Sequence, residues 1–202
     1  GAALPRVGEY CRAYREADPK RYLQGFVNSF GATVVAANTV IVKFDNLLNM
    51  PLSSLGMALS TYTGHNIGAG KEDRVRKGYY VSWIMAAGYS VFVYFVGHSQ
   101  RFGEIFVNLF VENEPEILAY GIRGMAIYST GVIFLSMIYN NRSVLNGAGD
   151  TAFALVVGLV EVVGRVGFAF LFVTVMKIGP EGLWYTAIAN WTLTGIVCML
   201  RY

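Results

Sequence analysis

Charged side chains are scarce in this chain. They make up 14% of its 202 residues, and the mean hydropathy is +0.45. An ordinary soluble domain carries roughly 25% charged residues, and a soluble surface of this size needs that polar cover. The net charge is +3 and the basic residues form no single stripe, so we expect no nucleic-acid partner. The composition therefore argues against a soluble globular protein.

Cysteine and histidine are nearly absent as well. Cys11 and Cys198 lie far apart, and His65 and His98 have no carboxylate or thiol at ligand spacing. This pattern predicts no disulfide framework, no metal site and no Ser-His-Asp or Cys-His catalytic set. No signal peptide is expected, because the first 21 residues lack an apolar core. We expect neither an enzyme nor a bound cofactor.

Long stretches without charge divide the rest of the chain. A membrane-spanning helix needs about 20 mostly apolar residues. Five stretches can each supply one, at about 34–67, 78–97, 117–141, 151–176 and 181–201. Their hydrophobicity does not alternate with period two, as β-barrel strands would, and a soluble bundle would need polar faces. The sequence predicts an all-α, polytopic membrane helical bundle.

Basic residues gather in every second connection. Lys71–Lys77 is rich in Lys and Arg, Arg142 follows the third span, and Arg201 follows the last. The connection 98–116 instead carries four glutamates against Arg101. The positive-inside rule then places 71–77, 142–150 and the C-terminus in the cytoplasm. We predict a multi-pass protein of the cell membrane, in contact with the lipid bilayer.

Residues 1–24 break this pattern, because eight charges fall between Arg6 and Arg21. Each Arg, Lys or Asp at the centre of a membrane helix costs about 2.5–3.5 kcal/mol even on mild scales. We therefore divide the chain into a charged, atypical N-terminal segment, 1–24, and a transmembrane helical lobe, 25–202.

Pro51 lies inside the first long span and predicts a helix kink, because proline removes a backbone hydrogen bond. Two interpretations stay open with equal weight. The kink is a hinge that flexes during a conformational change, or it is a static bend used for packing.

Several polar side chains are candidates for a substrate or ion cavity. Asn38, Asp45 and Asn49 share one helix face at spacings of seven and four, and Asn140 lies at the end of the third span. Ionisable groups inside membranes usually face a cavity or a partner. The alternative is an outer interface position, from which Lys43 and Asp45 extend to water.

Glu161 and Arg165 interrupt an otherwise apolar span. Their spacing of four, acid first, predicts an ion pair on one helix face. We favour a structural pair over a proton-carrying carboxylate, because an arginine partner keeps the acid ionised.

Several motifs resemble the MATE (multidrug and toxic compound extrusion) family of transporters, from about residue 25 to the C-terminus. Two glycine-rich helix stops, in 64–70 and 147–149, are the most specific. The matching segments are Phe26–Ala37, Met50–Thr61, Asn66–Lys71, Val144–Thr151 and the Glu161…Arg165 pair.

The resemblance implies twelve helices in two six-helix lobes around a central cavity. This chain would be the second lobe, and its partner would be the missing N-terminal six-helix lobe. The family implies a secondary active transporter that exports amphipathic or cationic drugs in antiport with Na⁺ or H⁺, by alternating access. The alternative is a flippase or exporter for lipid-linked saccharides, which needs a more basic cavity than Lys43 and Arg165 supply.

Two departures from the family pattern matter. The region of helix seven is strongly charged, so this helix is degraded or atypical; we hypothesise a frameshift, which the other reading frames of the coding DNA would test. Residues 124–141 hold no carboxylate, although some members carry a coupling acid midway along helix ten. The sequence therefore names no coupling residue.

Overall fold

A computed structural model describes residues 31–111 and 114–201, so the charged segment 1–24 lies outside the described residues. Within these ranges the chain is helical and contains no strand. The elements are α3 (Ala32–Gly68), α4 (Glu72–His98), α5 (Gln100–Asn108), α6 (Pro115–Gly147), α7 (Thr151–Ala169), the π-helical η1 (Phe170–Val175) and α8 (Glu181–Arg201). The predicted all-α membrane bundle is confirmed.

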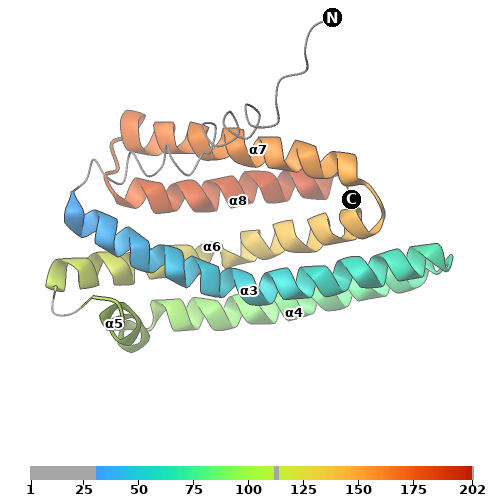
Figure 1. The fold of residues 1–202 in the computed structure, drawn as a ribbon, viewed down its shortest axis with the longest axis horizontal. Coiled ribbons are helices and arrows are strands. Elements are labelled where there is room, and N and C mark those ends of the chain that lie inside the picture. The colour runs from blue at the N-terminus through green and yellow to red at the C-terminus, as the bar shows by residue number, and fades with distance from the viewer. Residues whose placement is uncertain (1–30, 112–113, 202) are drawn as a thin grey trace, which may run out of the picture.

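The long helices lie side by side, and α6 is central among them (Figure 1). It contacts α3, α4, α5, α7 and α8. The helices α3 and α4 pack on one side of α6, and the α7–α8 hairpin packs on the other (Figure 1). The short α5 crosses one end of the bundle.

The main core forms where α3 meets α6 and α4. Val40, Phe44, Leu48 and Leu52 follow each other at intervals of four, so they line one face of α3. Against them lie apolar side chains of the other helices, including Val93, Val107, Met125, Val132, Leu135, Ile138 and Trp191. This face of α3 is therefore buried inside the bundle.

The predicted glycine stops are confirmed at two helix ends. The helix α3 ends at Gly68 and α6 at Gly147, and the turns that follow use Gly70 (φ 67°) and Gly149 (φ 86°). Only glycine adopts such positive φ values without strain. Asp150 then caps α7, because its Oδ1 accepts a hydrogen bond from the Phe153 amide at 3.3 Å.

Four helices in the described residues are long and apolar enough to cross a membrane: Glu72–His98, Pro115–Gly147, Val156–Val175 and Glu181–Arg201. They match four of the five predicted spans. The 37-residue α3 is not among them, so its crossing stays a prediction. It runs beside α4 for most of that helix's length (Figure 1).

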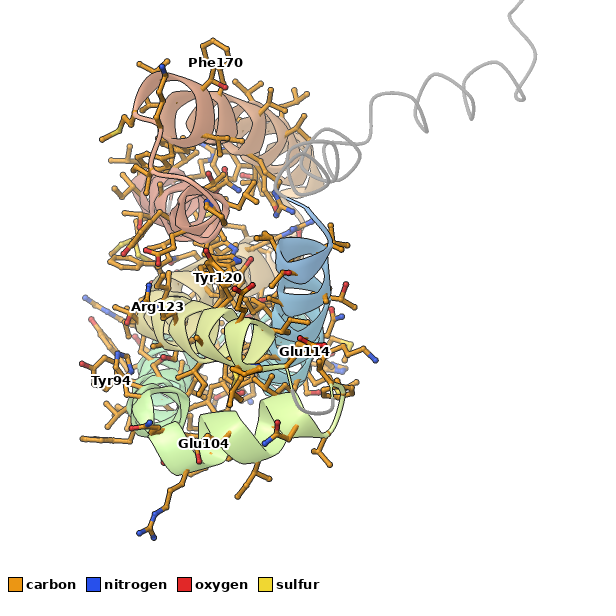
Figure 2. All side chains as sticks on the ribbon, turned by 90° about the vertical axis from the view of Figure 1, so that its left-hand side faces the viewer. Tyr94, Glu104, Glu114, Tyr120, Arg123 and Phe170 are labelled. Atoms are coloured by element: carbon orange, nitrogen blue, oxygen red, sulfur yellow. The ribbon has the colours of Figure 1, made fainter. Side chains whose placement is uncertain are left out.

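The basic connections and the acidic connection lie at opposite ends of the bundle. The basic connection between α3 and α4, the α6–α7 turn and the end of α8 share one end (Figure 1). Glu104, Glu114 and Arg123 come into view at the other end (Figure 2). Arg123 Nη1 contacts Glu181 Oε1 at 3.3 Å there, which joins α6 to α8.

Candidate functional site

The side of α3 away from the core carries a mixed stripe. Its members are exposed and follow each other at intervals of three or four: Lys43, Asn46, Met50, Ser54, Met57 and Thr61. Met50 and Met57 are 66% and 67% exposed. The hydroxyls of Ser54 and Thr61 donate back to carbonyls of their own helix. We call these six residues the α3 stripe.

The exposed sides of α4 and α7 are different. Between Val81 and Phe95 of α4, the exposed side chains are apolar or aromatic, apart from Gly88. The exposed residues between Val156 and Val166 of α7 are apolar. These two surfaces suit hydrocarbon, whereas lysine, asparagine and hydroxyl groups at mid-helix do not. The bundle therefore has an apolar surface on α4 and α7, which suits contact with lipid, and a more polar surface on α3.

Asp45, Asn49 and Tyr139 form a hydrogen-bonded chain where α3 meets α6. Asn49 Nδ2 donates to Asp45 Oδ1 at 3.0 Å and to the Asp45 carbonyl at 2.8 Å. Tyr139 of α6 donates its hydroxyl to Asn49 Oδ1 at 3.0 Å. The asparagine is thus held from both sides, and it orients the carboxylate of Asp45.

The four predicted cavity residues do not all meet. Asn38 lies two helical turns before Asp45 and is half-buried. Asn140 is buried, and its Oδ1 accepts a hydrogen bond from Ser82 of α4 at 2.6 Å. Asn38, Asp45 and Asn49 thus lie on one flank of α3, while Asn140 lies between α4 and α6. Their role in a cavity stays a prediction.

The neighbouring residue, Asn141, makes a similar contact, which residue spacing does not predict. Tyr79 of α4 donates its hydroxyl to Asn141 Oδ1 at 2.6 Å. Asn141 Nδ2 donates to the Met137 carbonyl within α6. Together with the Ser82–Asn140 bond, this contact joins α4 to α6 through side chains that a membrane would leave without water.

Pro51 lies within the continuous helix α3, and polar groups gather around it. Proline leaves the carbonyl four residues earlier, that of Leu47, without its usual donor. At the neighbouring residue, Leu48, the carbonyl accepts a hydrogen bond from Tyr89 of α4 at 3.1 Å. Ser53 and Ser54 donate to the Met50 carbonyl at 2.9 and 3.0 Å. Both interpretations of the proline, hinge and static bend, are compatible with this arrangement.

Arg165 and Glu161 are in contact on α7. Arg165 Nη2 donates to Glu161 Oε1 at 2.8 Å, and the side chains are 26% and 33% exposed. Each group thus neutralises the other within a helix whose exposed surface is apolar. In the described ranges, no group of three His, Cys, Asp or Glu residues could hold a metal ion.

Long, apolar helices packed around a central one, with charged connections at the two ends, define a polytopic membrane protein. A family model described as MatE matches residues 22–171, which is most of the chain. The chain belongs to the MATE family.

Two curated relatives illustrate the match. Multidrug and toxin extrusion protein 1 of Pongo abelii is 24% identical over 205 residues, which cover 99% of this chain and 34% of the relative. The protein named probable multidrug resistance protein YoeA, of Bacillus subtilis, is 23% identical over 168 residues, which cover 79% of this chain and 34% of the relative. The chain thus spans about a third of these relatives.

Proposed function

We propose that this chain forms one lobe of a MATE-type efflux transporter, which exports amphipathic or cationic drugs in antiport with Na⁺ or H⁺. The observation that carries the proposal is the α3 stripe. It is the mixed polar surface of a bundle whose α4 and α7 surfaces are apolar. In the proposed transporter this stripe faces a second, N-terminal lobe, with the substrate cavity between the two.

The composition of the α3 stripe supports a transporter of varied substrates. Methionine side chains are flexible and polarisable, so they adapt to ligands of different shape. Met50 and Met57 are exposed one above the other, two turns apart, with hydroxyl and amide groups beside them. A lipid-linked pyrophosphate would instead need several cations. The stripe offers Lys43, which lies over the Phe110 ring at 4.5 Å.

Asp45 is the acid that we propose for cation attraction in this cavity. It is half-buried on the side of α3 that faces Tyr139 of α6, and the Asn49–Tyr139 contact fixes its orientation. A half-buried carboxylate attracts a cationic drug or the coupling ion more strongly than a carboxylate in bulk water does. Glu161 lies on another helix, α7, in an ion pair with Arg165.

The test compares Asp45→Asn with Glu161→Gln in the complete transporter, measured as efflux of ethidium, a lipophilic cation, from loaded cells. We expect Asp45→Asn to slow efflux about tenfold or more, since about 1.4 kcal/mol of lost cation stabilisation is a factor of ten. Glu161→Gln, at equal membrane expression, retains most of the rate. Unchanged efflux by Asp45→Asn would refute the role of Asp45, and absence of efflux by the unmutated transporter would refute the function.

A further inference from the structure

The basic connection before α4 surrounds an open cavity of about 530 Å³. Three cations line it, Lys71, Arg74 and Lys77, together with Gly70, Glu72 and Asp73. The ion pairs found in the described part of the chain are Arg123–Glu181, Arg165–Glu161 and Arg201–Asp150, so none includes the three cations. The lining thus carries three cations against the two carboxylates of Glu72 and Asp73, which leaves a net charge of +1.

Backbone groups add to this positive field. The cap residue of α4, Lys71, makes no side-chain hydrogen bond to the first turn. The helix dipole places partial positive charge at this end, which Glu72 and Asp73 in the first turn partly offset. The Arg74 amide already donates to the Lys71 carbonyl at 3.1 Å. An anionic group in the cavity would meet the three cations and this partial charge, against the carboxylates of Glu72 and Asp73.

Two of the cations continue the apolar surface of α4. Arg74 and Lys77 stand three apart, and Val81, Ile84 and Met85 follow at helical intervals on the same side, all exposed. The rise from Lys77 to Met85 is about 12 Å, close to the depth of one hydrocarbon leaflet, about 15 Å. Cationic heads and an apolar track therefore form one continuous surface.

Aromatic residues place this surface at the membrane boundary. Tyr80 follows Lys77 within one turn and is 56% exposed, and Trp83 follows one turn later. Tyrosine and tryptophan gather at the level of lipid headgroups. The three cations then lie at headgroup depth and the track lies below them.

We propose that this surface binds an anionic phospholipid, with its phosphate in the cavity formed by Lys71, Arg74 and Lys77 and one acyl chain along Val81, Ile84 and Met85. Juxtamembrane basic clusters attract anionic lipids by about 1 kcal/mol per Lys or Arg. The proposed lipid site is confined to one side of α4. A general excess of positive charge would attract anionic lipids to every side of the helix. The proposal depends on the membrane setting of α4 and not on the transport function.

Arg76 supplies a matched control. It is exposed like Arg74, but it does not line the cavity, and its position two residues further turns it to another side of α4. Arg74→Gln and Arg76→Gln therefore remove the same charge at nearly the same depth. Both side chains are exposed, so both variants should fold, which their thermal unfolding in detergent checks.

The experiment measures lipid binding to the purified full chain by native mass spectrometry, with phosphatidylglycerol and phosphatidylcholine of identical acyl chains. We expect tighter binding of phosphatidylglycerol, a drop of about fivefold in Arg74→Gln, and little change in Arg76→Gln. Phosphatidylcholine should bind equally to all three proteins.

Three results would overturn the proposal. They are equal binding of both lipids by the unmutated protein, equal loss in the two variants, and binding of soluble glycerol phosphate as tight as that of phosphatidylglycerol. The last result would assign the cavity to a soluble anion. None of these results affects the efflux measurement with Asp45→Asn.

Discussion

At the residue scale, the effect of substituting Glu161 depends on its ion-pair partner, Arg165. Removing the carboxylate leaves a guanidinium on an apolar helix. We expect Glu161→Gln to lower the free energy of unfolding in detergent by about 1–3 kcal/mol, the usual cost of an unsatisfied polar group. Thermal unfolding measures this loss.

The double variant Glu161→Gln/Arg165→Gln is the control, because it removes both charges and keeps two side chains that can hydrogen-bond. It should recover most of the lost stability. A double variant less stable than Glu161→Gln would contradict a purely structural pair.

Residue spacing predicted contacts within a helix and missed contacts between helices. The Glu161–Arg165 and Asp45–Asn49 contacts both span four residues, a spacing that a helix brings together. Tyr139 and Asn49 are 90 residues apart, and Tyr79 and Asn141 are 62 apart. Such partners depend on how whole helices pack, which no local pattern specifies. The sequence therefore predicted part of the candidate site and none of its links between helices.

At the scale of elements, a close approach of α3 and α6 depends on Gly147. A methyl group added there would press on the Ser60 carbonyl oxygen and lie 2.7 Å from Thr63 Cβ. The first of these atoms is backbone and cannot turn away. We expect Gly147→Ala to force the helices apart and to cost about 1–3 kcal/mol, measured by thermal unfolding in detergent.

Gly88→Ala is the matched control in α4, since nothing lies within 4 Å of the added methyl group. Alanine is the better helix former by about 1 kcal/mol, so this variant should be as stable as the unmutated protein or more so. Equal destabilisation by the two substitutions would contradict the claim that Gly147 is needed for close packing of α3 against α6.

Helix ends were harder to predict than helix centres. The sequence placed the second span at 78–97, but α4 already begins at Glu72. The charges of 71–77 indicate a connection, yet Glu72 and Asp73 in a first turn favour the helix N-terminus. The predicted connection 98–116 contains a helix, α5. The signal was present, because Phe102, Phe106 and Phe110 recur every four residues and their rings contact each other.

At the scale of the whole molecule, the bundle is asymmetric in what it presents to its surroundings. The surfaces of α4 and α7 suit lipid, and α3 carries the polar stripe along one side. The helix α3 is not among the four long apolar helices, and it carries Lys43, Asp45 and several asparagines. A helix that faces a water-filled cavity needs less apolar surface than one that faces lipid on the same side.

The account depends most on the membrane crossing of these helices, with the Lys71–Lys77 connection in the cytoplasm and the acidic connection outside. The most direct measurement is maleimide labelling of single cysteines at two exposed positions, Arg76→Cys and Glu114→Cys. Both are made in the complete protein with Cys11→Ser and Cys198→Ala. The reagent does not cross membranes and is applied to intact cells. We predict that Glu114→Cys is labelled at once and Arg76→Cys only after permeabilisation. Equal labelling of the two in intact cells, or the reverse order, would contradict the account.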